Sequence, residues 1–198
     1  MTSLPDNILH LPEYHVLATK MEEHDLHYQV EAPEPLACEE CGVESEFVRF
    51  GKRDVAYRDL PIHGRRVTLW VVRRRYTCRA CGRTFRPALP EMVDDHRMTR
   101  RLYNHVEKEA FNHPYAYVAD TTGLDEKTVR EIFKKKAEFL AAWHRFETPR
   151  CLGIDELYLN RRYRCILTNL EERTLLDLLP GRQQDAVTRR LMSMTERH

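Results

Sequence analysis

The sequence predicts an α+β protein built from several domains, with strand-rich segments on either side of a helical one. Two C-x-x-C-G motifs, Cys38–Gly42 and Cys78–Gly82, bracket a stretch in which apolar and polar residues alternate. From Asp94 onward the apolar residues recur with the period of a helix, and after Pro149 strand-like runs return. A length of 198 residues is enough for more than one small domain.

Charge is divided unevenly between the first two parts of the chain. Residues 1–46 contain one lysine and eleven acidic residues, whereas residues 47–90 contain twelve lysines and arginines and two acidic residues. Such a basic block predicts a polyanionic partner, because each phosphate contact releases condensed counterions. The alternative is that the acidic part only neutralises the basic part within the fold. In the acidic segment of residues 1–35, Tyr14–Ala18 and Leu26–Val30 have the pattern of a β-hairpin.

The two cysteine pairs have the spacing of ligands that share one metal ion. In each pair the two intervening residues bring both sulfurs to one side of a tight turn, and the glycine that follows permits its backbone. Four thiolates make a closed tetrahedral shell, so the sequence predicts a structural Zn²⁺ held by Cys38, Cys41, Cys78 and Cys81. Disulfides or a redox-active pair are the alternatives. A cytosolic setting disfavours the first, and the presence of two matched pairs disfavours the second.

The predicted zinc ribbon covers residues 36–92, and a β-sheet joins its two cysteine turns. We expect strands at Phe47–Phe50, Val55–Tyr57 and Val67–Tyr76, separated by turns at Gly51-Lys52 and His63-Gly64. The basic block falls almost entirely within this domain, which makes the ribbon the first candidate for contact with a polyanion.

Residues 93–147 are predicted to form a helical domain that contains a helix–turn–helix. Helices are expected from about Arg97 to Phe111, from Tyr115 to Thr121, and from a cap at Asp125 onward. The intervals between Ala119, Gly123, Val129 and Ile132 suit this motif, because a small alanine lets the helices approach and glycine adopts a left-handed turn. An ordinary helical hairpin with a glycine turn is the alternative.

Residues 148–198 begin a third domain, in which three strands precede a helix. The strands are expected at Arg150–Glu156, Tyr163–Thr168 and Thr174–Leu179, with a turn at Asn160-Arg161, and the helix from about Gln183. The first is interpreted as a buried strand that ends in acidic residues. Cys151 and Cys165 stand singly in apolar runs, so both are expected to be buried and without chemistry. These elements begin a mixed sheet without completing one.

The order of four stretches along the chain is characteristic: CEECG, RRRYTCRACGRTF, the predicted helix–turn–helix, and LGIDE followed by YRCILTNLEERTLLDLLPGR. From about Leu36 to Leu191 this order resembles the bacterial insertion-sequence transposases of the ISL-three family. In that family the last segment opens an RNase H-like domain, whose D-D-E triad holds two Mg²⁺ ions for phosphoryl transfer. The resemblance implies that Asp155 is the first triad carboxylate and that residues 148–198 are an incomplete RNase H-like sheet.

Enzymatic activity is not expected of this chain by itself. The chain ends before the positions of the second Asp and the Glu of the family, and neither Glu156 nor Asp177 occupies a matching position. One carboxylate does not organise two metal ions, so Mg²⁺ is expected only in a complete family member. We therefore expect that the chain alone neither cuts nor joins DNA.

The resemblance implies binding to double-stranded DNA at the terminal inverted repeats of an insertion sequence. The chain itself or a full-length transposase is the expected protein partner. A transcriptional regulator with the same modules, or a module that binds nucleic acid or protein, are the alternatives. Without a signal peptide or an apolar run of roughly 18–20 residues, the expected location is the cytoplasm, at the nucleoid, with no membrane partner.

The expected DNA contacts divide into two groups. Residues at the start of the helix that follows Asp125 are expected to reach base edges: Lys127, Thr128 and Arg130. Arginines of the ribbon are expected to contact phosphates: Arg65, Arg66, Arg73, Arg74, Arg75, Arg79, Arg83 and Arg86. Because side chains alternate along a strand, only some of these arginines are expected to share a face.

Overall fold

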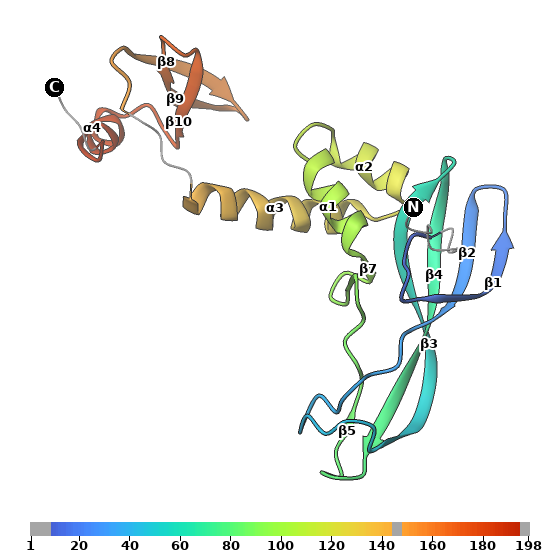
Figure 1. The fold of residues 1–198 in the computed structure, drawn as a ribbon. Helices are drawn as coiled ribbons and strands as arrows, with labels where there is room; N and C mark the ends of the chain where they lie inside the picture. Colours follow the sequence, from blue (N-terminus) through green and yellow to red (C-terminus); the bar gives the residue numbers. More distant parts are fainter. Residues whose placement is uncertain (1–8, 144–147, 195–198) are drawn as a thin grey trace, which may run out of the picture. The chain divides into compact units, whose positions relative to one another are not determined.

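The computed structural model describes residues 9–143 and 148–194, which belong to two compact units, residues 1–139 and 140–198 (Figure 1). The protein is of the mixed α/β type. Over the described ranges it contains a seven-stranded mixed sheet and three helices in the first part, then a three-stranded antiparallel sheet and a fourth helix. The domain boundaries expected near residues 35, 92 and 147 remain predictions.

The sheet of the first unit is organised around one long hairpin. Its strands are β1 (His15–Met21), β2 (Asp25–Glu31), β3 (Phe47–Ile62), β4 (Arg65–Cys78), β5 (Thr84–Phe85), β6 (Met92–Val93) and β7 (Met98–Thr99). The order is β1-β2-β4-β3-β7-β6, and β5 pairs with β4 at its end. The β1–β2 hairpin confirms the expected one, and β2 then runs parallel to β4.

Alternation along the strands gives this sheet one apolar face and one polar face. On β2 every second residue is buried, Leu26 and Val30 among them, and the residues paired with these two in β4, Val67 and Val71, are buried on the same face. The N-terminal segment around Tyr14 covers this face and completes the core, together with residues that follow β5. The opposite face is covered only in part: Thr68 and Val72 are buried there and the turn at Gly123 contacts Arg66, whereas Trp70 is 41% exposed.

The hairpin of β3 and β4 departs from the prediction at one place. The expected turn at Gly51-Lys52 is wrong, because β3 continues through it with a bulge between Arg49 and Gly51. Gly51 has φ 151°, a conformation that glycine adopts without a steric cost. The turn at His63-Gly64 is confirmed, and both residues have positive φ there.

Three helices follow the sheet: α1 (Arg100–Glu109), α2 (Tyr115–Thr122) and α3 (Glu126–Trp143). The first begins later than the expected Arg97, because Met98 and Thr99 form β7 and the Thr99 hydroxyl caps the helix. Gly123, between α2 and α3, has φ 72°, as expected for a left-handed turn. The apolar residues that predicted these helices lie together in one buried cluster: Leu102, Val106, Ala110, Val118, Ala119, Val129 and Ile132.

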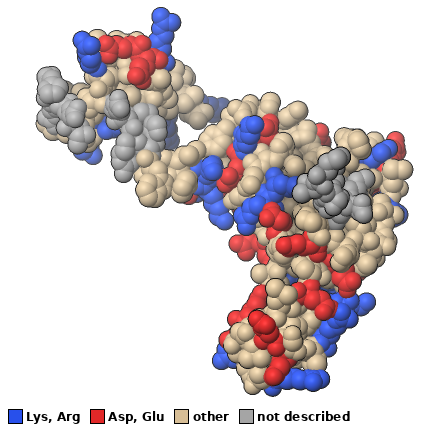
Figure 2. All heavy atoms as spheres, in the orientation of Figure 1, with Lys and Arg blue, Asp and Glu red and all other residues tan. Residues whose placement is uncertain are grey.

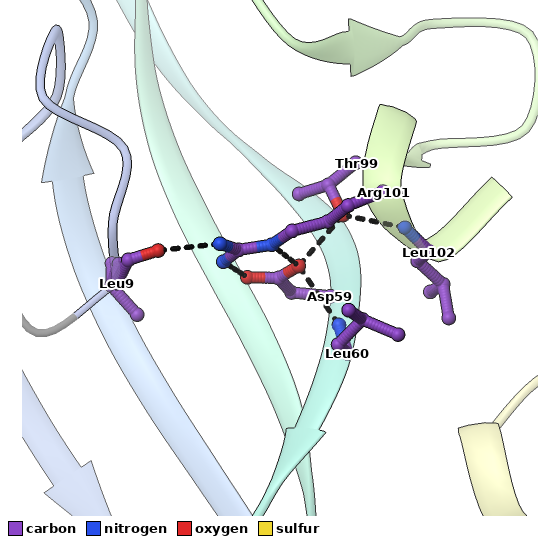
Figure 3. A network of polar contacts seen from close by, with 6 residues as sticks. All are labelled: Leu9, Asp59, Leu60, Thr99, Arg101 and Leu102. Carbon is purple, nitrogen blue, oxygen red and sulfur yellow. Dashed lines mark hydrogen bonds and ion pairs between the residues drawn. The ribbon is translucent and has the colours of Figure 1, made fainter. Parts of the chain in front are cut away.

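A buried carboxylate joins the sheet to the helices (Figure 3). Asp59 of β3 is fully buried, and Arg101 of α1 binds both its oxygens, one through Nε at 2.7 Å and the other through Nη2. The Thr99 hydroxyl and the Leu60 N–H also donate to this carboxylate. Arg101 reaches further, to the carbonyl oxygen of Leu9 at 2.6 Å. The strand, the helix and the N-terminal segment are thereby held at one point.

The second unit consists of β8 (Leu152–Leu159), β9 (Arg162–Asn169), β10 (Thr174–Leu179) and α4 (Gln184–Met192), with strand order β10-β9-β8. Contrary to expectation, β8 is largely exposed and runs three residues past Glu156, because it is an edge strand and α4 packs on one face of the sheet only. Cys165 is buried as expected, but Cys151 is exposed, so that prediction is wrong. No helix within the described ranges is both long and apolar enough to cross a membrane.

Candidate metal centre and nucleic-acid interface

Two turns with the same hydrogen-bond pattern carry the four cysteines. The Gly42 N–H donates to the Cys38 carbonyl at 2.8 Å, and the Gly82 N–H donates to the Cys78 carbonyl at 3.0 Å. Both glycines have positive φ, 75° and 69°, as the sequence motif requires. In both turns the first cysteine is buried and the second is exposed, so each turn offers its sulfurs to the same side.

The four sulfurs lie at the spacing that zinc requires. All of them fall within 4.8 Å of one another, with Sγ distances of 3.7 Å between Cys41 and Cys78 and 4.0 Å between Cys38 and Cys81. A tetrahedron with Zn–S bonds of about 2.3 Å has S–S edges of about 3.8 Å. The site therefore fits a structural zinc ion with four thiolate ligands, as predicted.

The electrostatics of the cluster also suit a cation. The backbone N–H of Cys81 donates to the Cys78 sulfur and stabilises its thiolate; despite partial desolvation, this lowers the pKa of Cys78 to about 7. A hydrogen bond from the Val43 backbone has the same effect on Cys41, but desolvation and contact with the other sulfurs outweigh it and raise its pKa to about 12. A divalent cation at the centre favours the thiolate form of every ligand.

A small aromatic cluster packs beside the metal centre. The Tyr76 and Phe85 rings stack at 5.8 Å, and Phe47 packs edge-on against both. These rings pack with the buried Cys38 and Cys78 in one apolar cluster. The end of the ribbon thus has only a small core of its own, so we expect its stability to depend on the metal.

Many of the ribbon arginines are engaged by acidic residues of the chain. Ion pairs join Arg66 to Asp25, Arg73 to Asp94, Arg74 to Glu31 and Arg83 to Glu40, and an unpredicted one joins Arg49 to Glu34. Arg65 donates to the Glu23 carbonyl. Most of these partners come from the acidic N-terminal segment, and Figure 2 shows acidic and basic side chains side by side over the zinc end of the ribbon. The neutralisation considered as an alternative is thus present for part of the basic set.

Four of the predicted arginines have no ion pair among the described residues. Arg65 is one, since it contacts the Glu23 carbonyl and the Met21 sulfur; the others are Arg75, Arg79 and Arg86. The guanidinium of Arg75 lies over the exposed ring of Phe50, 4.9 Å from its centre. Arg74 is its neighbour on β4, yet it faces Glu31 on the other side of the strand, as alternation predicts. The exposed Phe50 beside Arg75 was missed, because a lone apolar residue in a strand predicts only burial.

The start of α3 presents the predicted base-contact residues in two different ways. Lys127 and Arg130 are exposed; Lys127 lies near Glu131 and Arg130 near the Tyr115 ring. Thr128 is half-buried, and its N–H and hydroxyl both donate to the Asp125 carboxylate at 2.8 Å. These hydrogen bonds lower the pKa of Asp125 and cap the helix. Thr128 is therefore engaged in capping, whereas Lys127 and Arg130 point to solvent.

Asp155 lies on β8, opposite Ile166 of β9, and is exposed. Its carboxylate accepts a hydrogen bond from the Glu156 N–H, while Glu156 pairs with Arg182 and Asp177 pairs with Arg190. In the described parts of the chain, the four cysteines are the group of side chains placed to hold a metal ion, and Asp155 belongs to no such group.

Comparison with known proteins identifies the metal centre. Residues 34–81 match the family described as the zinc-finger of transposase IS204/IS1001/IS1096/IS1165. The match covers about a quarter of the chain and includes all four cysteines together with the whole β3–β4 hairpin between them. This segment is therefore a zinc-finger domain of the ISL3 transposase type. Neither the curated proteins nor the solved structures gave a match to the chain.

Proposed function

We propose that this protein binds double-stranded DNA as the end-recognition region of a transposase of this family. The observation that carries the proposal is the four-cysteine site inside a segment of the transposase zinc-finger type. DNA transposition is the role of the family to which that zinc finger belongs. Terminal inverted repeats are the DNA that such a region recognises, and a second copy or a full-length transposase is the protein partner.

Base recognition is assigned to the exposed side of α3. Lys127 and Arg130 stand within the first two turns of the helix, and the three-helix core holds its opposite side. A helix held in this way enters the major groove with its first residues against base edges. Thr128 contributes by capping the helix, so its effect on binding is indirect.

Phosphate contact is assigned first to the predicted ribbon arginines whose side chains make neither an ion pair nor a hydrogen bond with another described residue. Arg75, Arg79 and Arg86 bind a phosphate without losing an ion pair. Arg74, by contrast, would exchange Glu31 for the phosphate and gain less. The acidic N-terminal segment thereby limits nonspecific attraction to DNA, because it offsets part of the basic charge at close range.

A catalytic role for Asp155 is proposed only within a complete RNase H-like domain. The described part of the second unit, three antiparallel strands with a helix on one face, agrees with the opening of such a domain. Asp155 would then be one of the three carboxylates that hold Mg²⁺. By itself this carboxylate does not form the site, so strand cleavage is not assigned to the described residues.

The experiment that tests the proposal is salt-dependent binding of the zinc-loaded protein to duplexes with the inverted repeats of the element and to scrambled duplexes. Tighter binding to the repeats, with a steep dependence on salt, is the expected result. Arg130→Ala should reduce the preference for the repeats, and Arg75→Gln should weaken binding to both duplexes. Selective binding to a promoter instead would favour a transcriptional regulator, and no binding to either duplex would favour a protein-interaction module.

A further inference from the structure

A cleft of about 630 Å³ lies in the first unit, between the polar face of the sheet and the start of α3. Its floor comes from β2, β3 and β4, and one wall is the turn from Gly123 to Thr128. His96 and Arg97, just before β7, form another part of the wall. A volume of this size is typical of pockets for small molecules and is far too small for a DNA duplex.

At one edge of this cleft, Gly123 of the turn before α3 contacts Arg66 of β4. A Cβ atom at Gly123 would stand 2.7 Å from Cδ of Arg66, so the turn rests directly on the stem of the arginine. Arg66 is in turn held by Asp25 of β2. At this edge of the cleft the turn before α3 is therefore in direct contact with the sheet.

Trp70 provides an apolar surface in an otherwise polar floor. Its side chain is 41% exposed although it lies in the central strand β4. The indole Nε1 donates to Nδ1 of His27 at 3.3 Å, which fixes the ring. Ala56 of β3 is paired directly with Trp70, and its small side chain leaves space beside the indole ring. An ordered, partly uncovered indole is a platform on which a planar group stacks.

The charges around the platform leave an excess of positive charge. Two of the three carboxylates of the lining are in ion pairs, Glu22 with Lys20 and Asp25 with Arg66. The third, Asp125, accepts hydrogen bonds from Thr128 and keeps its negative charge. Arg58 donates only to the Thr68 hydroxyl, at 2.7 Å, and Arg97 has no side-chain partner among the described residues. The backbone of Arg97 is tied to the sheet, since its carbonyl accepts from the Arg58 N–H at 2.8 Å. Two guanidinium groups without an ion pair, those of Arg58 and Arg97, therefore share the cleft with the indole, against the single unpaired carboxylate of Asp125.

We propose that this cleft binds one unpaired nucleotide of a DNA strand, with the base stacked on Trp70 and the phosphate between Arg58 and Arg97. An aromatic platform beside unmatched arginines is the combination that recognises single-stranded nucleic acid. The site lies beside the first turn of α3, which reads the duplex in the proposed function. This inference rests on that function, and it adds a position at which the DNA strand is unpaired.

Fluorescence of Trp70 tests the cleft directly. The chain has two tryptophans, so Trp143→Phe leaves Trp70 as the only one. Titration of this zinc-loaded variant with a short single strand of thymidine nucleotides should quench the Trp70 emission. Trp70→Ala should weaken binding of a labelled strand by about 5- to 150-fold, the range found when a stacked base loses its aromatic partner. Trp70→Phe should retain most of the affinity.

A matched pair of arginine variants separates the cleft from general attraction to charge. Arg97→Gln should weaken binding of the single strand clearly more than Arg100→Gln, since Arg100 is exposed but does not line the cleft. Absence of quenching, or equal loss with both arginine variants, would overturn the proposal. Duplex binding measured in parallel tells the two proposals apart. Quenching by single strands without duplex binding would support the cleft proposal and contradict end recognition. Normal duplex binding without quenching would support end recognition and contradict the cleft proposal.

Discussion

Replacing Asp59 by asparagine tests whether one buried carboxylate holds the sheet and the helices together. The substitution keeps the shape of the side chain but removes its charge and one of its two acceptor oxygens. Asp59 is 0% exposed and accepts hydrogen bonds from Arg101, Thr99 and Leu60. In the Asp59→Asn variant the guanidinium of Arg101 is left without its counter-charge, and an amide N–H faces donors that it does not satisfy.

The cost follows from this geometry. Removing one partner of a buried, hydrogen-bonded ion pair lowers the free energy of unfolding by about 3–5 kcal/mol. Arg101 keeps some contact with water, because its side chain is 31% exposed, so we expect a value near the lower end of that range. With a urea dependence of about 2 kcal/mol per molar, the midpoint of unfolding should fall by roughly 1.5 M.

Urea unfolding followed by Trp70 fluorescence is the assay, in the Trp143→Phe background so that the signal reports on the first unit alone. Glu34→Gln is the matched control, because it also turns a carboxylate into an amide but breaks an exposed pair with Arg49. Exposed pairs contribute about 0–1 kcal/mol. If Asp59→Asn cost no more than Glu34→Gln, the carboxylate would not be the junction that we infer.

Three further predictions concern the metal, the helix cap and the two faces of β4. Removal of zinc with a chelator should unfold the end of the ribbon that carries the two cysteine turns (the zinc knuckles), seen as fast hydrogen exchange of the Phe47 amide. Continued protection of this amide from exchange would mean that the metal is dispensable. Asp125→Ala should lower the free energy of unfolding by about 1 kcal/mol at neutral pH. The hydrogen bonds from Thr128 lower the pKa of Asp125 in the folded state, so the difference in stability between the two proteins should vanish as the pH falls through that pKa. A difference that persists in acid would refute the cap. Arg75→Gln should reduce the salt slope of duplex binding by about one and Arg74→Gln by much less, so equal slopes would contradict the assignment of faces.

Local patterns predicted the parts of the fold that depend on near neighbours. The cysteine spacing defined the metal centre because a four-residue turn fixes two ligands at once. The intervals from Ala119 through Gly123 to Ile132 predicted α2, the left-handed turn and α3, since helix packing depends on residues three and four apart. The strand Thr174–Leu179 was also placed correctly, although a bulge between Leu175 and Asp177 interrupts its pairing with β9 and was not predicted.

Long-range pairing is what the sequence did not reveal. Asp59 stands in a charged stretch of strand, where a carboxylate predicts exposure, and only the approach of Arg101 from α1 explains its burial. The arginines were predicted as one basic set, yet contacts with residues far away in the chain divide them into paired and unpaired members. Trp70 lies within the predicted strand Val67–Tyr76, but the sequence alone did not show that its side chain is partly exposed. Its position opposite Ala56 became visible only once the register of β4 was known.

In the proposed function, the long hairpin sets the spacing between the two regions that contact DNA. The zinc knuckles adjoin Phe47 at one end of β3, and Asp59 near its other end is clamped to the helix that precedes the helix–turn–helix. Twelve residue steps of about 3.4 Å make roughly 40 Å along the strand, which is little more than one turn of B-DNA. Because the Asp59 junction prevents the helices from swinging freely, contacts made by the knuckles and by α3 would fall about one helical turn apart on the same duplex. The proposed function therefore requires the junction as much as it requires the zinc.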